Sequence, residues 1–430
     1  MRSLAAIIAA GVTACAPRPA WHAVSPDHRS TVDVVQRGSS VCVARDARDV
    51  GCYDAVDLHR LEFSPEGAHL AYPVQHGRRW AIVRDGRLSA WWEAVGAPVW
   101  AGNGSRMAFA AFDGTSWRVV VDDEPGETFD AVLDGSLVID SRGKHVGYAA
   151  RRGDSAHVVV DGVPGQGWPS VGLIVLGAGG DGVAYAARST AGAMAVVNGR
   201  IGPLHDAIVS LILSDSGVRA AYAARDRGRW TVVEPEGERG PYEQVRALSF
   251  HPDQRRVAFV ARAGSSESVV INGLTQGWHS SVERAAFSAG GAHWGYLGHD
   301  SSGSRIVIDG AEVAREAWAR DLVLSEHGRH RAWVARGADS LLAVVDDRGR
   351  YHYDVVVDGT LQFIGAGGSW ACLAGDRRRR RLFVVVDGAA TDRLLDWSEL
   401  IRLGDRHAAS AALRAWVGAE AALEVGMVAP

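Results

Sequence analysis

Residues 217–225 read GVRAAYAAR, an apolar run with one aromatic residue among alanines and an arginine at its end. Related stretches are GKHVGYAAR at 143–151, DGVAYAAR at 181–188, RRVAFVAR at 255–262 and RHRAWVAR at 329–336. The aromatic residue recurs at Tyr72, Phe109, Tyr148, Tyr185, Tyr222, Phe259, Tyr296 and Trp333, with successive spacings of 37, 39, 37, 37, 37, 37 and 37 residues. Ala371 continues the series after a further 38 residues. A regular period of this length indicates a repeat protein whose units stack on one another.

Turn signals divide each unit into four short strands. One apolar strand ends in Asp-Gly or Asn-Gly, at 85–86, 161–162, 198–199, 272–273, 309–310 and 387–388. These dipeptides favour the type I′ turn of a β-hairpin, in which both central residues have a positive φ. An aromatic residue followed three positions later by an apolar one, as in Tyr53 and Val56, marks the next strand. Four-stranded sheets that repeat radially are the blades of a β-propeller.

The sequence therefore predicts an all-β propeller of about ten four-stranded units, each of about 37 residues. The even period, without a Pro/Ser-rich linker, favours one ring over two smaller propellers or a miscount of degenerate units. Val41–Val43 and Tyr53–Val56 resemble the third and fourth strands of a unit, and 400–403 with 413–417 resemble a first and a second. We expect these segments to form one composite blade that closes the ring and protects its open edges.

Composition narrows the class of protein. The 430 residues are 47% hydrophobic, which is ample for a core and excludes a disordered chain. The 46 basic and 50 acidic side chains give a net charge of −4, so the sequence does not predict a nucleic-acid partner.

Three elements of the unit are similar to those of a known family. They are FSPEG at 63–67, the AYAA strand at 221–224 and the VVVDG hairpin at 158–162. They resemble bacterial WD40-like (PD40, TolB-type) propeller repeats, and the resemblance covers roughly residues 35–425. It implies a propeller that serves as a binding platform, and it leaves the partner unnamed because propellers host many activities.

The N-terminus predicts export. Met1–Ser3 is a short positive segment, and Leu4–Ala14 is an apolar run too short to cross a bilayer. The residues before Cys15 resemble a bacterial lipobox, which implies that Cys15 is the lipid anchor, and Ala16 after it favours the outer membrane. An ordinary cleaved signal peptide is the alternative. We expect a signal peptide at 1–14, an anchor and flexible tether at 15–34, and the propeller at 35–430.

An exported chain meets an oxidising compartment, in which cysteines can pair. Cys42 and Cys52 lie ten residues apart across an expected hairpin and are candidates for a disulfide; two separate buried thiols are the alternative. Cys372 lies in an apolar run and is expected in the core. No CxxC pair indicates a structural zinc site.

Signatures of catalysis are missing from the sequence, which contains no HExxH, P-loop or GxSxG motif. His327 and His330 are three residues apart but lie in an expected turn, so we expect no metal there and no cofactor. The sequence therefore predicts a protein that is not an enzyme, and a hydrolase or lyase of the propeller type stays an alternative.

Several side chains are candidates for binding. Arg60, Arg246, Arg284 and Arg320 each come three or four residues before an aromatic residue or leucine of an expected inner strand, and could ring one mouth of the channel as a rim for anions or an acidic partner. Unrelated solvated loop residues are the alternative. A run of five arginines could contact anionic lipid, or could simply be solvated: Arg377, Arg378, Arg379, Arg380 and Arg381.

Tryptophans that repeat with the unit could stack on sugars, but packing between blades explains them better: Trp80, Trp117, Trp168, Trp230 and Trp278. We therefore expect an envelope lipoprotein whose propeller is a non-catalytic platform or scaffold for protein partners in a periplasmic or outer-membrane assembly. The membrane is reached through the lipid at Cys15. A surface carbohydrate-binding module is the second reading, and an enzyme the third.

Overall fold

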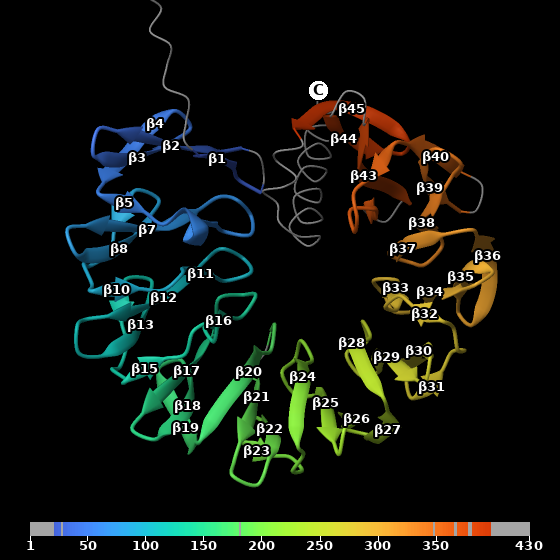
Figure 1. Ribbon diagram of the computed structural model, residues 1–430, viewed down its shortest axis with the longest axis horizontal. Helices are drawn as coiled ribbons and strands as arrows, with labels where there is room; N and C mark the ends of the chain where they lie inside the picture. Colours follow the sequence, from blue (N-terminus) through green and yellow to red (C-terminus); the bar gives the residue numbers. More distant parts are fainter. Residues whose placement is uncertain are drawn as a thin grey trace, which may run out of the picture.

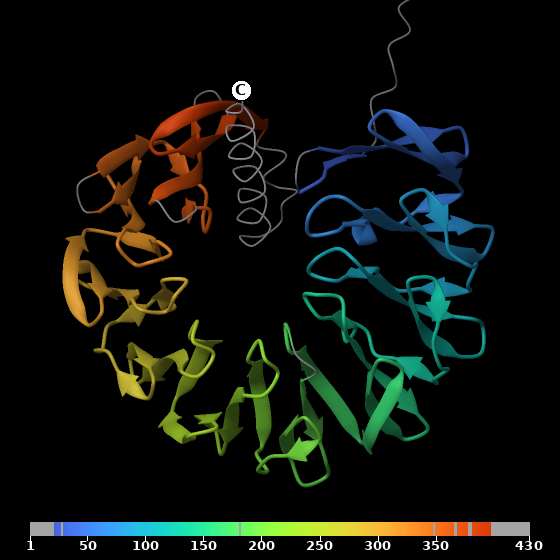
Figure 2. The ribbon, with the colours of Figure 1, turned by 180° about the vertical axis from the view of Figure 1, so that it is seen from behind.

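The computed structural model describes residues 21–26, 29–179, 182–346, 349–364, 368–376 and 381–396. These residues form ten antiparallel sheets that follow one another in chain order around a common centre, seen from the two sides in Figures 1 and 2. Each sheet runs from an inner first strand to an outer fourth strand. The arrangement confirms the predicted all-β propeller of ten four-stranded units, which we number as blades 1 to 10 from the N-terminus.

The first, innermost strand has two forms. It is continuous in blades 1, 5, 6, 7 and 9: β1 (Trp21–Val24), β20 (Ser170–Leu176), β24 (Ala207–Leu213), β28 (Gln244–Phe250) and β37 (Ala319–Leu324). It is split into two short pieces in blades 2, 3, 4, 8 and 10: β5 (Ala55–Val56) and β6 (Glu62–Phe63) around the 3-10 helix η1 (Leu58–Arg60), β10 (Ala94–Val95) and β11 (Val99–Trp100), β15 (Ala131–Val132) and β16 (Val138–Ile139), β32 (Ser281–Val282) and β33 (Ala286–Phe287), β41 (Val355–Val356) and β42 (Gln362–Ile364).

The other three strands are single in every blade. Second strands are β2 (Thr31–Arg37), β7 (Leu70–His76), β12 (Met107–Phe112), β17 (Val146–Arg152), β21 (Val183–Arg188), β25 (Ala220–Asp226), β29 (Val257–Ala263), β34 (Trp294–Asp300), β38 (Arg331–Arg336) and β43 (Ser369–Asp376). Third strands are β3 (Ser40–Arg45), β8 (Arg79–Arg84), β13 (Trp117–Val121), β18 (Ser155–Val160), β22 (Ala193–Val197), β26 (Arg229–Glu234), β30 (Ser266–Ile271), β35 (Gly303–Ile308), β39 (Leu341–Val345) and β44 (Arg381–Val386). Fourth strands are β4 (Arg48–Tyr53), β9 (Arg87–Leu88), β14 (Glu124–Pro125), β19 (Val163–Trp168), β23 (Arg200–Ile201), β27 (Gly237–Tyr242), β31 (Leu274–Thr275), β36 (Ala311–Glu316), β40 (Gly349–Tyr353) and β45 (Ala389–Asp396).

The repeated Asp-Gly dipeptide makes the turn between the third and fourth strands. Asp85 and Gly86 have φ values of 48° and 82°, the pair of positive values that a type I′ turn requires. Oδ1 of Asp85 also accepts a hydrogen bond from the backbone N–H of Leu70, which ties the turn to the second strand. The same hydrogen bond recurs, donated by the backbone N–H of Val146 to Asp161, of Trp294 to Asp309, of Arg331 to Asp346 and of Trp370 to Asp387. The aspartate is therefore repeated because it supports the turn.

The core lies between blades, where a large side chain of one blade meets small ones of the blade before it. Phe109 of blade 3 packs against Ala71 of blade 2, while Ala108, its neighbour on β12, packs against Tyr148 of blade 4. Phe259 likewise packs against Ala221 and Ala223 of blade 6. Successive residues of a strand point to opposite faces of the sheet. The alternation of alanine and an aromatic residue in the repeat is thus a pattern for stacking blades.

Blade 1 differs from the expected composite blade. Val41–Val43 lie in its third strand and Tyr53 ends its fourth, as predicted, but its first and second strands are β1 and β2. The described part of the propeller therefore starts with Trp21, inside the 15–34 segment expected to be a flexible tether, and Val56 belongs to blade 2. Backbone pairing of Trp21 with Val34 supplies the partner that the sequence pattern did not reveal. Residues 400–403 and 413–417 lie outside the described residues.

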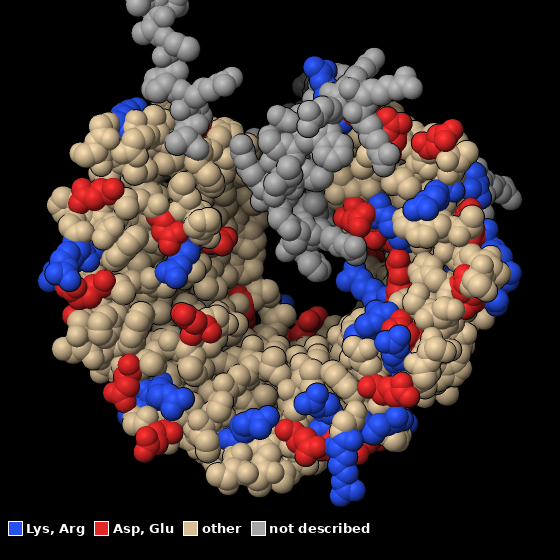
Figure 3. Space-filling model, in the orientation of Figure 1, with Lys and Arg blue, Asp and Glu red and all other residues tan. Residues whose placement is uncertain are grey.

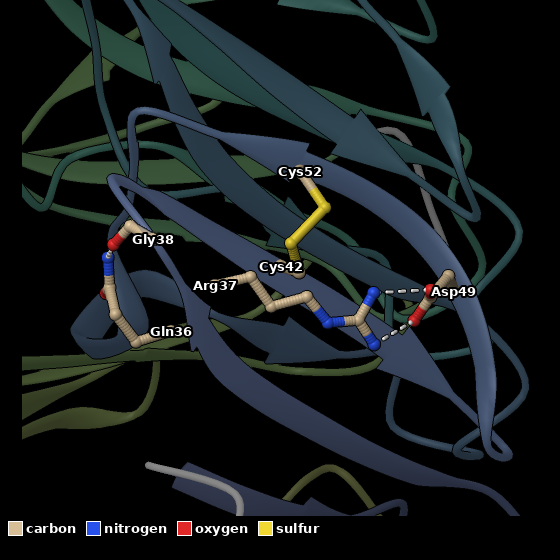
Figure 4. The surroundings of a disulfide bond; sticks show 6 residues. All are labelled: Gln36, Arg37, Gly38, Cys42, Asp49 and Cys52. Atoms are coloured by element: carbon tan, nitrogen blue, oxygen red, sulfur yellow. Dashed lines mark hydrogen bonds and ion pairs between the residues drawn. A yellow bond between two sulfur atoms is a disulfide. The ribbon is translucent and has the colours of Figure 1, made fainter. Parts of the chain in front are cut away.

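The two cysteines of blade 1 form a disulfide, shown in Figure 4. Cys42 of β3 is directly opposite Cys52 of β4 in the strand register. Beside them Arg37 binds Asp49 through two hydrogen bonds, of 2.7 and 3.0 Å, which join the ends of β2 and β4. The disulfide and the ion pair both hold the outermost strand of the first blade.

In blade 10 the position of the repeated aromatic residue is taken by Cys372, not by Ala371. Cys372 pairs with Val385, two residues before Asp387, just as Tyr72 pairs with Val83, two residues before Asp85. The side chain is fully buried, as expected from its apolar neighbours.

The buried thiol of Cys372 is expected to be chemically silent in the folded protein. Burial raises its pKa to about 12, so almost no reactive thiolate exists at neutral pH. Iodoacetamide should modify Cys372 only after denaturation, which peptide mass spectrometry of native and denatured samples can measure. Modification of the native protein at the rate of an exposed thiol would contradict this placement.

Candidate functional site

Three of the four predicted rim arginines bind the backbone of the next blade. Arg60 donates a hydrogen bond to the carbonyl of Val95 at 3.1 Å, Arg246 to that of Val282 at 2.6 Å, and Arg320 to that of Val356 at 2.7 Å. The three acceptors are equivalent, because each valine ends the first piece of a split inner strand. These guanidinium groups therefore join consecutive blades along the channel wall.

Carboxylates make similar connections in blades 8 to 10. Glu283 accepts a hydrogen bond from the N–H of Asp321, and Asp321 accepts one from the N–H of Gly359, both across 38 residues. Arg320 forms ion pairs with Asp321 and Asp358 in the same network. Figure 3 shows the charged side chains of both signs on this side of the central opening, over β28, β33 and β37.

The anion-binding rim stays a prediction: three of its four arginines make contacts within the propeller, and the side chains of Arg60 and Arg246 are still 47% and 40% exposed. Arg60, Arg246 and Arg320 are already hydrogen-bonded, since the curvature of the ring brings a carbonyl of the next blade within their reach. Arg284, which is exposed like Arg60 and Arg246, makes no hydrogen bond or ion pair to a described residue. The channel wall is a structural network.

Arg246 also holds a buried carboxylate. Its Nη2 lies 2.6 Å from Oε2 of Glu267, which accepts a further hydrogen bond from the N–H of Val282. Burial alone would raise the pKa of Glu267, but the hydrogen bonds from Arg246 and Val282 outweigh it and leave the pKa below its ordinary value of 4.5. Glu267 is therefore ionised at neutral pH and connects blade 7 to blade 8.

We expect Glu267→Gln to lower the free energy of unfolding by about 1 kcal/mol at neutral pH, because neutral hydrogen bonds replace charge-assisted ones. A group whose pKa is lowered by folding stabilises the protein above its unfolded pKa, and this contribution is lost as the pH falls through the folded pKa. The difference between wild type and variant should therefore shrink below about pH 4.5. Urea unfolding at a series of pH values measures it, and a difference that is constant with pH would contradict the assignment.

The two ends of the blades carry different repeated polar contacts. We call the end with the Asp-Gly turns the turn face and the end with the hairpins between second and third strands the hairpin face. On the turn face, four histidines lie 2.6–2.7 Å from a turn aspartate, each 16 residues later: His69 with Asp85, His145 with Asp161, His293 with Asp309 and His330 with Asp346. These pairs were not predicted from the sequence, although their constant spacing of 16 residues is a signal that could have revealed them.

His330 is thus engaged with Asp346, away from the metal pair considered with His327. In the described part of the chain, no group of three or more His, Cys, Asp or Glu side chains is placed to hold a metal ion.

On the hairpin face, an aspartate follows the aromatic residue that leads into several blades. Oδ2 of Asp54 accepts a hydrogen bond from the N–H of Gly77, Asp130 from Gly153, and Asp206 from Arg227. Each bond caps the hairpin of the same blade. Blade 7 has Glu243 at this position, and its carboxylate lies 3.8 Å from Arg229 of blade 6 instead.

The hollows between blades of the described structure include the following two. One, of about 400 Å³, is lined by Trp230, Glu243, Gln244, Arg262 and Gly264, between blades 6 and 7. The other, of about 270 Å³, lies between blades 4 and 5 and is mostly apolar; its lining includes Val158, Val160, Val163, Pro164, Val183 and Val196. We call the second hollow the apolar groove.

The repeated tryptophans are placed largely as predicted. Trp80, Trp168 and Trp230 pack in clusters that join two consecutive blades. The ring of Trp117 lies 5.2 Å from that of Phe112, whereas Trp278 is 46% exposed.

Of the arginine run, only Arg381 lies within the described residues, at the start of β44; Cys15 and Arg377–Arg380 lie outside them. Among the residues described, no helix is long and apolar enough to cross a membrane.

No family model matches the sequence, and no curated protein is significantly similar to it. Among solved structures, the chain is similar to a eukaryotic initiation factor, with 11% identity over 75% of this chain and 95% of that one and a TM-score of 0.40. It is also similar to the Dos1 propeller (10% identity, 64% and 89% covered, TM-score 0.33) and to TolB from Acinetobacter baumannii (12% identity, 57% and 78% covered, TM-score 0.25). The assignment of the fold rests on the ten radial sheets themselves.

Proposed function

We propose that the protein is an exported lipoprotein, anchored through Cys15, whose propeller is a non-catalytic platform for a protein partner of the cell envelope. The observation that carries the proposal is the apolar groove between blades 4 and 5. Val163, on its wall, is 69% exposed, and Ile201 of the adjoining strand β23 is 51% exposed. Exposed apolar surface beside a hollow is typical of sites that bind proteins.

The groove suits an apolar side chain of a partner. Val158 and Val160 lie in β18, the third strand of blade 4, and Val196 lies in β22, the third strand of blade 5, so these walls belong to the core packed between the two blades. An anchoring side chain inserted there would be removed from water without ordering a loop of the platform. We expect such a partner to offer an aliphatic or aromatic residue surrounded by polar ones.

Export is supported by the disulfide between Cys42 and Cys52, because disulfides persist in oxidising compartments. The apolar segment before Cys15, with its resemblance to a lipobox, supports anchoring. The outer membrane is the destination that we propose, since Ala16 follows Cys15.

The test is affinity capture from detergent-solubilised membranes, read by mass spectrometry. Wild type should retain a stoichiometric envelope protein, Val163→Asp should lose it, and Val218→Asp should keep it. Val218 is the matched control, because it is 72% exposed but lies outside the groove. Cys15→Ala should release the propeller from the membrane fraction. Equal capture by the two aspartate variants would refute the groove, and a wild type recovered without lipid would refute the anchor.

A further inference from the structure

One arginine position of the repeat has no role in the contacts described so far. It lies three residues after the repeated aromatic residue, near the hairpin face, and is occupied at Arg151, Arg188, Arg225, Arg262 and Arg336. The first four belong to consecutive blades, 4 to 7, and the fifth to blade 9. The repeat therefore places an arc of guanidinium groups along one face of the ring.

These five arginines form no ion pair with a carboxylate of the described residues. This sets them apart from Arg246 and Arg320, which are bound to acidic side chains. Arg188 donates only to the backbone carbonyl of Asp206, and Arg336 lies over the ring of Trp318. All but the half-buried Arg151 are exposed. Arg262 lies opposite Glu267 in the strand register without forming an ion pair with it. Guanidinium groups that form no ion pair keep donors that can bind the carboxylates of a ligand.

The hollow between blades 6 and 7 lies on this arc. Arg262 lines it, and Arg225 is the cross-strand neighbour of Trp230, which forms another wall. In blades 2, 4 and 6 an aspartate fills the equivalent place and caps the hairpin, as Asp206 does. In blade 7 the carboxylate of Glu243 turns toward Arg229, and the space beside Gly264 stays open. Glu93 of blade 3 turns in the same way toward Arg79 of blade 2, at 3.6 Å, so in both blades a glutamate at this position does not cap the hairpin.

We infer that this hollow binds an acidic saccharide. Trp230 packs on one side against the core between blades 6 and 7, and its remaining surface can cover the C–H face of a sugar ring. Arg262 binds the sugar carboxylate with its planar fork of donors. The Gln244 amide donates hydrogen bonds to sugar hydroxyl groups and accepts hydrogen bonds from them, and the Glu243 carboxylate accepts hydrogen bonds from them. Arg225 and Arg188 extend the arc toward the acidic groups of adjoining sugar units.

A saccharide fits better than an acidic protein segment because of the mixed lining. The hollow has one aromatic wall and three polar side chains, which match a ring with one apolar face and a rim of hydroxyl groups. An apolar pocket for a protein side chain is found instead at the apolar groove. The inference therefore stands independently of the proposed protein partner.

The experiment is calorimetric titration of the purified propeller with trigalacturonate and with neutral galactotriose. We expect the acidic trisaccharide to bind at least about tenfold more tightly, and binding to weaken as salt is added. Arg262→Gln and Gln244→Ala should each weaken it by about tenfold or more. Arg336→Gln is the control: it removes an arginine of the same repeat position far from the hollow and should bind like wild type.

Three results would overturn the inference. They are no binding of either sugar, equal binding of both, and an equal loss with Arg262→Gln and Arg336→Gln. A pentaglutamate peptide serves as the second probe. If it binds in an Arg262-dependent way while the sugars do not, the hollow takes an acidic protein segment instead.

Discussion

Replacing Trp333 by alanine is expected to lower the free energy of unfolding by about 3–5 kcal/mol. The indole is fully buried between blades 8 and 9, where it packs against Leu297 and Ile306 of one blade and Leu342 of the other. The substitution removes the largest side chain of this junction and leaves a cavity that rigid sheets on both sides cannot close. No hydrogen bond is lost, because the indole N–H has no partner among the described residues.

Urea unfolding followed by circular dichroism measures the effect of Trp333→Ala. Trp278→Ala is the matched control, since it deletes the same side chain from a position that is 46% exposed, and should change stability by less than about 0.5 kcal/mol. Amide exchange of β38 reports whether the loss is local to the junction. If both variants were equally stable, packing between blades would not be what holds the ring together.

Removing the disulfide by the double change Cys42→Ala and Cys52→Ala is expected to cost about 2–3 kcal/mol. The bond closes a loop of ten residues, and opening it returns the conformational freedom of that loop to the unfolded chain. Cys42 is also buried, so its shortening removes a contact in blade 1. The loss should be concentrated in this blade, where β4 is held at the edge by the disulfide and by Arg37.

Thermal unfolding of the oxidised wild type, the reduced wild type and the double variant tests this expectation. Reduction should reproduce the effect of the substitutions, and Cys372→Ala should not, because that thiol is unpaired. Oxidised and reduced wild type with the same midpoint would show that the bond contributes nothing to stability.

Much of the fold could be predicted from the sequence because each sequence repeat of about 37 residues forms one blade of the ring. Tyr222 and its equivalents occupy the same place in each junction, and Asp309 and its equivalents support the same turn. Both kinds of residue therefore recur at a regular spacing in the sequence. Blade 1 lacks these signals: Asp33 of β2 takes the place of the repeated aromatic residue, and Asp46-Ala47 takes the place of the Asp-Gly turn. The strand character of β1 depends on pairing with β2.

The channel and the surface sites were harder to predict. Whether Arg320 is free depends on how near the carbonyl of Val356 lies, and this distance is set by the curvature of the ring. The side chain of Glu243 is one methylene group longer than the aspartate that caps the hairpin in other blades. Whether it caps a hairpin depends on this extra length and on the position of Arg229. Neither follows from a spacing in the sequence. The arginines three residues after the repeated aromatic residue were visible as a motif in the sequence. Only the structure shows that they form no ion pair with a described carboxylate.

The packing of an aromatic residue of one blade against small residues of the blade before it gives blades 2 to 9 two unlike sides, one that projects and one that receives. A duplication or loss of one complete unit would leave each remaining junction matched, whereas a change by part of a unit would set two projecting or two receiving sides together. The size of the ring can therefore evolve in steps of one blade. Differences that matter to ligands can accumulate at exposed positions such as Glu243, one blade at a time, without disturbing the junctions.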